Sequence, residues 1–189
     1  MDDIAVTNIT LPNTCTAAVA GVPVLVGAAS RLTHSAAGTF DAPMSLNGSG
    51  VESRNASGNH TIVLHLDRAM QSGNATVMSG TGSVGSVSFS GDMLVNLNGV
   101  VDKQKLTISA TNLTPVNGSV LNSVSLTLGF LVGDSTGDGT VNSGDAQQAR
   151  NRSGQLTDGT NFRSDINRDG AINSGDAIIV RGRSGNSLP

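Results

Sequence analysis

Two twelve-residue stretches near the C-terminus carry oxygen-bearing side chains at the same five places. They are residues 134–145 (DSTGDGTVNSGD) and 165–176 (DINRDGAINSGD). Each has Asp, Asn or Thr at its first, third, fifth, ninth and twelfth positions and glycine at its sixth. Oxygen ligands at this spacing, with a glycine for the sharp turn, form the pattern of an EF-hand-type loop. The spacing therefore predicts two calcium ions, one in each loop.

A short loop surrounds calcium only if alternate residues turn inward, because the ion takes six to eight oxygens at about 2.3–2.6 Å. In the first loop we expect ligands from Asp134, Thr136, Asp138, the carbonyl of Thr140, a water held by Asn142, and Asp145. In the second loop we expect Asp165, Asn167, Asp169, the carbonyl of Ala171, Asn173 and Asp176. At the third position the first loop has the hydroxyl of Thr136 where the second has the amide oxygen of Asn167, so we expect the first site to bind calcium more weakly. At the eighth position, Val141 and Ile172 are apolar and are expected to pair the two loops back to back.

The acidic residues of this region are concentrated in the loops. From residue 134 onward there are seven Asp and no Glu, and only Asp158 lies off the first, fifth and twelfth positions. Three carboxylates that converge on one point repel each other unless a cation lies among them. This sorting disfavours the alternative of two Asx-rich turns that bind nothing.

The duplication extends beyond the loops. Each loop is followed by a short helical run, at 146–152 and 177–183, and each run is ended by a glycine, Gly154 or Gly185. A calcium loop followed by one helix, repeated once, resembles a type I dockerin over residues 133–189.

The resemblance implies a calcium-dependent plug that binds a cohesin-like domain and so assembles secreted or cell-surface proteins of bacterial type. It also implies partner contacts from loop positions ten and eleven and from the helices. The corresponding residues are Ser143, Gly144, Arg150, Arg152, Ser174, Gly175, Arg181 and Arg183.

Residues 1–132 are predicted to form a β-sandwich of about nine strands, immunoglobulin-like or cohesin-like, ahead of the calcium module at 133–189. Apolar and polar residues alternate and Gly-containing turns separate the runs. The candidate strands are 4–11, 17–28, 38–46, 62–66, 75–78, 86–90, 94–97, 106–110 and 124–132. Phe40, Phe89 and Phe130 are the largest expected core side chains. The fold class is thus mostly β with a small C-terminal α module.

The junction between the two parts has no Pro- or Ser-rich linker. The last expected strand runs through Gly133 directly into Asp134, which leaves little slack. We therefore expect the calcium module to be held against the end of the sandwich. Phe162, between the repeats, is expected to fill the small core between the two loop–helix units.

Catalytic patterns are weak in this chain. His34, His60 and His65 are not spaced as a metal set, and His65 is expected on the outer face of its strand. The Gly-x-Gly-x-x-Gly pattern at 80–85 precedes a strand-like run and not a helix, so it lacks the context of a nucleotide site. We expect a protein without enzymatic activity.

Composition narrows the class further. A net charge of −3 gives no electrostatic case for nucleic acid, and no apolar run approaches the roughly 20 residues of a membrane span. The absence of Trp and Tyr makes carbohydrate binding an unfavoured alternative. The acidic start lacks a signal peptide's positive region, so a secreted protein would be represented here by a mature form or a fragment. For the single Cys15, a small buried side chain is favoured over pairing between molecules.

Two functional hypotheses stay open. The first is a calcium-stabilised extracellular assembly or anchoring module that docks a secreted protein onto a partner. The alternative is a structural subunit of a filament, in which the calcium module of one copy contacts the sandwich of the next, as head-to-tail contacts allow. An enzyme fragment is the least favoured hypothesis.

Overall fold

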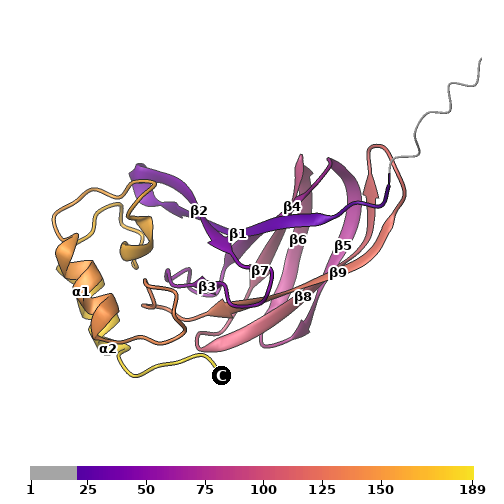
Figure 1. Ribbon diagram of the computed structural model, residues 1–189. Helices are drawn as coiled ribbons and strands as arrows, with labels where there is room; N and C mark the ends of the chain where they lie inside the picture. Colours follow the sequence, from indigo (N-terminus) through magenta and orange to yellow (C-terminus); the bar gives the residue numbers. More distant parts are fainter. Residues whose placement is uncertain (1–20) are drawn as a thin grey trace, which may run out of the picture.

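The computed structural model describes residues 21–189, which form two packed β-sheets with a small helical module at one end (Figure 1). The expected strand at 4–11 and Cys15 lie outside the described residues. The strands are β1 (Leu25–His34), β2 (Gly38–Met44), β3 (Val51–Glu52), β4 (His60–Leu66), β5 (Met70–Ser79), β6 (Ser83–Ser90), β7 (Asp92–Asn98), β8 (Gln104–Pro115) and β9 (Leu121–Phe130). The helices are α1 (Ser143–Asn151) and α2 (Ser174–Gly182), with short 3₁₀ turns at Ser35–Ala37 and Phe162–Ser164.

One sheet has five strands in the order β2-β1-β4-β7-β6, and the other has four in the order β3-β9-β8-β5. The pairings are antiparallel except that of β3 with β9, which is parallel. The inward side chains of both sheets form one core, with Ile62 and Leu64 from the first sheet and Leu106, Ile108 and Phe130 from the second. The mostly β fold with a C-terminal α module, predicted from the sequence, is confirmed.

Strand positions differ from the prediction mainly at β1. The strand expected at 17–28 begins at Leu25 and continues to His34. The second half of this strand was not predicted because polar residues such as Ser30 and Arg31 interrupt the apolar alternation, although Ser30 is fully buried. β3 was not predicted, because two residues are too few to show alternation. On β4, His65 lies on the outer face as expected, with its Nδ1 3.0 Å from Asp92 Oδ2.

The two helices begin three residues earlier than predicted, at Ser143 and Ser174, because they include the last three residues of each loop. Asn142 and Asn173 are the N-caps, and each forms a capping box with the aspartate three residues later. Gly154 and Gly185 follow the helices with positive φ values of 89° and 90°, the left-handed conformation that glycine adopts readily. Within residues 21–189, neither helix is long and apolar enough to cross a membrane.

The helical module packs against the sandwich at the end where β2 and β3 lie (Figure 1). A second, smaller core joins Val51 of β3 and Leu131 to Val141, Ile166 and Val180 of the module. The module is therefore held against the end of the sandwich, as the short junction predicted.

Candidate metal centre

The first loop gathers the residues predicted at positions one, three and twelve. Asp134 and Asp145 are fully buried, and the hydroxyl of Thr136 lies between them. Its Oγ1 is 3.2 Å from Asp134 Oδ1 and 2.9 Å from Asp145 Oδ1. The structure thus brings two carboxylates and one hydroxyl to a common place.

The remaining predicted positions of the first loop form a second linked group. The side-chain amide of Asn142 lies 3.4 Å from both Asp138 Oδ2 and the carbonyl oxygen of Thr140. Asp138 is exposed, unlike the first and twelfth acids. Its side of the loop therefore faces solvent.

The second loop repeats this arrangement on its exposed side. The amide of Asn167 donates to Asp169 Oδ2 at 2.8 Å, and the amide of Asn173 lies 3.3 Å from both Asp169 Oδ2 and the carbonyl oxygen of Ala171. The buried Asp176 accepts backbone N–H bonds from Ile166 and Asn167, at 2.7 and 3.2 Å.

Each loop brings its predicted ligand oxygens together in pairs, but its three carboxylates do not converge. Among residues 21–189, no three His, Cys, Asp or Glu side chains lie close enough to hold a metal ion. Convergence of the three carboxylates on one ion stays a prediction. In this structure the buried acids accept hydrogen bonds from backbone amides, as Asp134 does from the N–H groups of Gly137 and Gly139, at 2.7 and 2.8 Å. The donors are nonetheless all oxygens, the chemistry that calcium prefers.

The buried acids are costly to keep charged. Burial raises the pKa of Asp134 above its ordinary value, as does the charge of Asp145, although N–H bonds from Gly139 and Gly137 oppose the shift. Burial likewise raises the pKa of Asp176, with a further contribution from Asp165. A divalent cation beside these carboxylates would stabilise their charged forms.

Asp165 differs from its counterpart Asp134, because two side chains outside the loop bind it. Its Oδ2 lies 2.9 Å from His34 Nδ1 and accepts a 2.7 Å hydrogen bond from Thr157 Oγ1. Burial alone would raise the pKa of Asp165, but the bonds from His34 and Thr157 outweigh it and lower the pKa. Sequence reasoning missed both residues, since His34 is separated from Asp165 by 131 positions and no spacing rule links them.

Behind His34 lies a buried ion pair of the sandwich. Arg54 binds Glu52 through two bonds of 2.8 and 2.6 Å, and its Nη1 lies 3.2 Å from His34 Nε2. Burial would raise the pKa of Glu52, but the charge and hydrogen bonds of Arg54 lower it to about 2.

Three module arginines attach the loops to the sandwich. Arg163 donates to the carbonyl oxygens of Val51 and Pro43, at 3.1 and 3.2 Å, and Arg168 donates to that of Asn55 at 2.7 Å. The third, Arg183, forms an ion pair with Asp102 of the sandwich.

Phe162 belongs to the same contact. Its ring stacks on Phe40 of β2, with centroids 5.4 Å apart and planes 8° from parallel, and the guanidinium of Arg54 lies 5.2 Å from its centroid. The prediction that it fills the core between the repeats is wrong, because Val141, Ile166 and Val180 close the module's core with sandwich residues. Phe40 and Phe89, predicted as sandwich core, are only half-buried, whereas Phe130 is buried.

The eighth-position residues are fully buried, but their backbones pair differently from the prediction. Val141 exchanges backbone hydrogen bonds of 2.8 Å with Gly185 and Asn186, which follow the second helix. Ile172 exchanges bonds of 2.8 and 2.9 Å with Gly154 and Gln155, which follow the first helix. Each loop is therefore bonded to the tail of the other repeat and not to the other loop.

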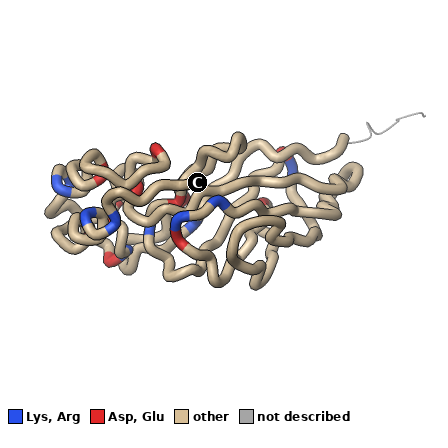
Figure 2. Tube along the Cα trace, turned by 90° about the horizontal axis from the view of Figure 1, so that it is seen from below, with Lys and Arg blue, Asp and Glu red and all other residues tan. Residues whose placement is uncertain are grey.

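The residues predicted to contact a partner lie in two environments. Arg150 and Arg181 are exposed and line the same groove between α1 and α2, beside the exposed Ile178. By contrast, Arg152 donates to Ser164 at 2.9 Å, and Arg183 is bound to the sandwich. Figure 2 shows basic residues both on the helical module and near its junction with the sandwich. The other four predicted residues are not arginines: Ser143, Gly144 and Ser174 are exposed, and Gly175 is half-buried.

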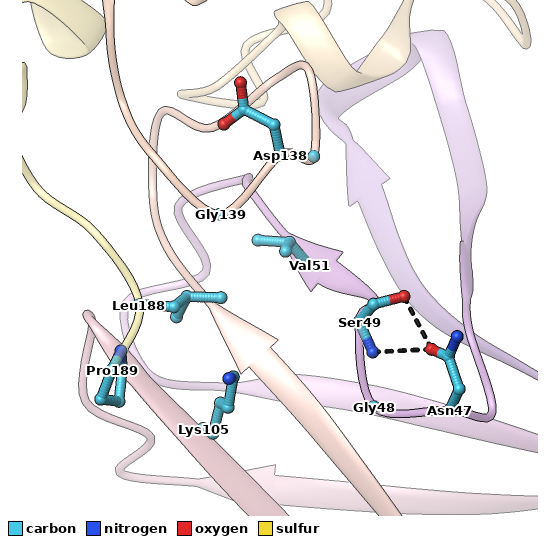
Figure 3. Close-up of a pocket in the computed structure, with 10 residues that line it drawn as sticks. Asn47, Gly48, Ser49, Val51, Lys105, Asp138, Gly139, Leu188 and Pro189 are labelled. Carbon is cyan, nitrogen blue, oxygen red and sulfur yellow. Dashed lines mark hydrogen bonds between the residues drawn. The ribbon is translucent and has the colours of Figure 1, made fainter.

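A second groove, of about 580 Å³, separates the first loop from the sandwich (Figure 3). Asp138 and Gly139 lie on its module side, and Ser49, Asn47 and Lys105 lie on its sandwich side. Asn47 Oδ1 accepts bonds of 3.0 and 2.7 Å from the N–H and hydroxyl of Ser49, which hold that turn. The groove leaves the fifth position of the first loop open to solvent.

In a comparison with known families, residues 132–183 match the Dockerin type I domain. The resemblance inferred from the two loops is thus confirmed for this part of the chain. No curated protein and no solved structure matched the chain.

Proposed function

We propose that this chain is a calcium-stabilised, non-catalytic extracellular protein that docks onto a protein partner through its dockerin module. The match over residues 132–183 supports a protein–protein docking role. The observation that carries the proposal is the duplicated twelve-residue loop, in which Thr136 Oγ1 lies near Asp134 and Asp145 and the Asn167 amide lies near Asp169. We propose the division into a β-sandwich at 1–132 and a docking module at 133–189.

Calcium is the proposed cofactor, with one ion in each loop. The first loop would hold it with Asp134, Thr136, Asp138, Thr140, Asn142 and Asp145, and the second with Asp165, Asn167, Asp169, Ala171, Asn173 and Asp176. Bound calcium would supply charge compensation for buried acids such as Asp134 and Asp176, whose pKa values are raised. Because ligand residues in the unfolded chain are not gathered, binding also stabilises the folded module.

The proposed partner surface is the outer face of α1 and α2. Arg150 and Arg181 flank a groove there, and Ile178 is 65% exposed. The opposite side of the module is covered by its own sandwich through Arg163 and Arg168. A cohesin-like domain is the partner class that the dockerin match supports.

Binding to a panel of purified cohesin domains tests this proposal, with calcium or with a chelator. We expect calcium-dependent binding that Arg150→Ala and Arg181→Ala weaken at least about tenfold, since arginines are frequent interface hot spots. Arg68→Ala, on the sandwich and paired with Asp67, is the matched control and should bind normally. Binding that persists in chelator, or that resists both helix variants, would contradict the proposed surface.

The filament alternative predicts a different result from the same sample. Calcium-dependent, concentration-dependent polymers of the pure chain, with no cohesin binding, would favour it. Because Arg168 and the small core already join the module to its own sandwich, such a contact would use the exposed outer helix face.

A further inference from the structure

The sandwich supplies a ligand to the second loop's first acid. His34 is the last residue of β1, and both it and Asp165 are fully buried. The 2.9 Å contact between His34 Nδ1 and Asp165 Oδ2 therefore lies inside the contact between the two parts of the chain. A buried hydrogen bond to a carboxylate fixes both the position and the orientation of that group.

The neighbour of His34 determines which ring nitrogen donates. An arginine guanidinium carries only donors, so the 3.2 Å contact with Arg54 Nη1 requires His34 Nε2 to accept. The proton is then on Nδ1, which donates to Asp165. Arg54 is itself fixed by Glu52 and by the carbonyl oxygen of Ser30, at 2.7 Å from Nη2. Glu52, Arg54, His34 and Asp165 thus form a series of hydrogen bonds in which Arg54 donates to Glu52 and His34, and His34 donates to Asp165. Its first three members belong to the sandwich.

The first loop has no counterpart of this series of hydrogen bonds among the described residues. Asp134 accepts hydrogen bonds from its own loop, from Thr136 and from the backbone N–H groups of residues 137, 138 and 139. The two loops, which share seven of their twelve residues, therefore differ in the groups that position their first acid. The additional donors to Asp165 come from outside its loop, His34 from the sandwich and Thr157 from the segment between the two repeats.

We propose that His34 is a positioning residue for the second calcium site, which makes the affinity of that site depend on the sandwich. The inference rests on the calcium binding proposed above. Groups that hydrogen-bond to metal ligands without touching the metal commonly contribute tenfold to hundredfold to metal affinity. Because coupling between binding and docking is reciprocal, calcium in the second loop strengthens the attachment of the module to the sandwich by the same factor.

The amides of Gly139 and Gly170 allow each loop to be followed separately by NMR in the full chain. Gly139 N–H donates to Asp134 Oδ2 at 2.8 Å, and Gly170 N–H donates to Asp165 Oδ2 at 3.0 Å. Each resonance therefore reports on the first acid of its own loop during a calcium titration.

Two replacements of His34 separate its two hydrogen bonds. His34→Asn places an amide nitrogen near the position of Nδ1 and can keep the donor to Asp165. His34→Gln places its polar atoms near Nε2, so it can keep the contact with Arg54 but lacks the donor. His65→Asn, on the outer face of the same sheet and paired with Asp92, is the matched control.

We expect the Gly170 resonance to titrate before that of Gly139 in the parent chain. His34→Gln should weaken the Gly170 transition by about tenfold to hundredfold and leave the Gly139 transition unchanged. His34→Asn and His65→Asn should stay within about threefold of the parent at both loops. An unchanged Gly170 transition in His34→Gln, or equal weakening of both loops, would overturn the proposal.

Two further results keep the outcome decisive. If His34→Gln does not fold, Thr157→Val removes the other outside donor to Asp165 Oδ2, and an unchanged Gly170 transition there would overturn the idea that outside donors position this acid. If calcium moves neither glycine resonance in the parent, the proposed calcium binding fails together with this inference. If calcium moves both but His34 has no effect, only this inference fails.

Discussion

At the scale of single residues, the sequence identified the loop positions but not their environment. The spacing of Asp, Asn and Gly marked both loops, because ligand geometry is encoded within twelve consecutive residues. The partners of Asp165 could not be found in this way, since His34 lies on β1 and reaches the loop only in the folded chain. The carboxylate orientations also escaped prediction, because backbone N–H groups compete for the same oxygens.

Replacing the first acid of the second loop tests the ligand assignment directly. Asp165→Ala should lower the calcium stoichiometry from two ions to one in isothermal titration calorimetry. It also leaves the buried donors of His34 and Thr157 unpaired, at about 1–3 kcal/mol each. Asp158→Ala, the acid outside both loops, should keep two ions. Two ions in the Asp165 variant would refute the assignment.

The buried Glu52–Arg54 pair predicts a dependence of stability on acid pH. The pKa of Glu52 is lowered from 4.5 to about 2 in the fold, so the unfolded chain takes up the proton first as the pH falls. The stabilisation is present above about pH 4.5 and is lost by about pH 2, with a total of roughly 3 kcal/mol.

Urea unfolding across this pH window measures the effect. The parent should lose more stability on acidification than the double variant Glu52→Gln/Arg54→Met, which removes both charges and leaves neither of them unpaired. Parallel pH curves for the two proteins would show that the pair does not titrate as inferred.

At the scale of elements, alternation identified most strands but not the short parallel β3. Although β3 has only two residues, the backbone in and next to it forms hydrogen bonds with both the segment after β9 and the helical module. The carbonyl of Val51 accepts from Arg163, and those of Glu52 and Ser53 accept from the N–H groups of Leu131 and Gly133. Such contacts depend on distant residues and leave no local pattern for the sequence to show.

Gly50, directly before β3, is predicted to tolerate no larger side chain. A β-carbon there would lie 2.6 Å from Ser45 N and 2.9 Å from Met44 Cα, which are backbone atoms with little freedom to move. Gly50→Ala should lower the free energy of unfolding by about 1–3 kcal/mol. Gly159→Ala, with nothing within 4 Å of the new atom, serves as the control in chemical denaturation. Equal stability of the two variants would mean that the turn before β3 yields easily.

At the scale of the whole molecule, the short junction indicated a docked module, but its contacts came from residues scattered along the chain. Arg168 adopts a left-handed φ of 63°, uncommon for arginine, and donates to Asn55 O from that conformation. Asn55 N–H in turn donates to Ile166 O at 2.8 Å. The Asn55 amide is therefore a local reporter of docking.

Removing the Arg168 contact should loosen the module without unfolding the sandwich. A hydrogen bond from a charged group contributes about 1.5–3 kcal/mol, so Arg168→Ala should speed hydrogen exchange at the Asn55 amide by roughly ten- to hundredfold. Arg181→Ala, exposed on the outer helix face, should leave exchange unchanged. Similar exchange in both variants would show that Arg168 does not hold the module in place.

The crossed backbone pairing of the module has a consequence for its synthesis on the ribosome. Val141 of the first loop is bonded to Gly185 and Asn186, and Leu188 N–H donates to Gly139 O. The first loop is therefore translated early, but the residues that close it emerge from the exit tunnel only after the entire second repeat. A nascent chain stalled before residue 185 would carry a sandwich followed by a module whose first loop lacks its backbone partners.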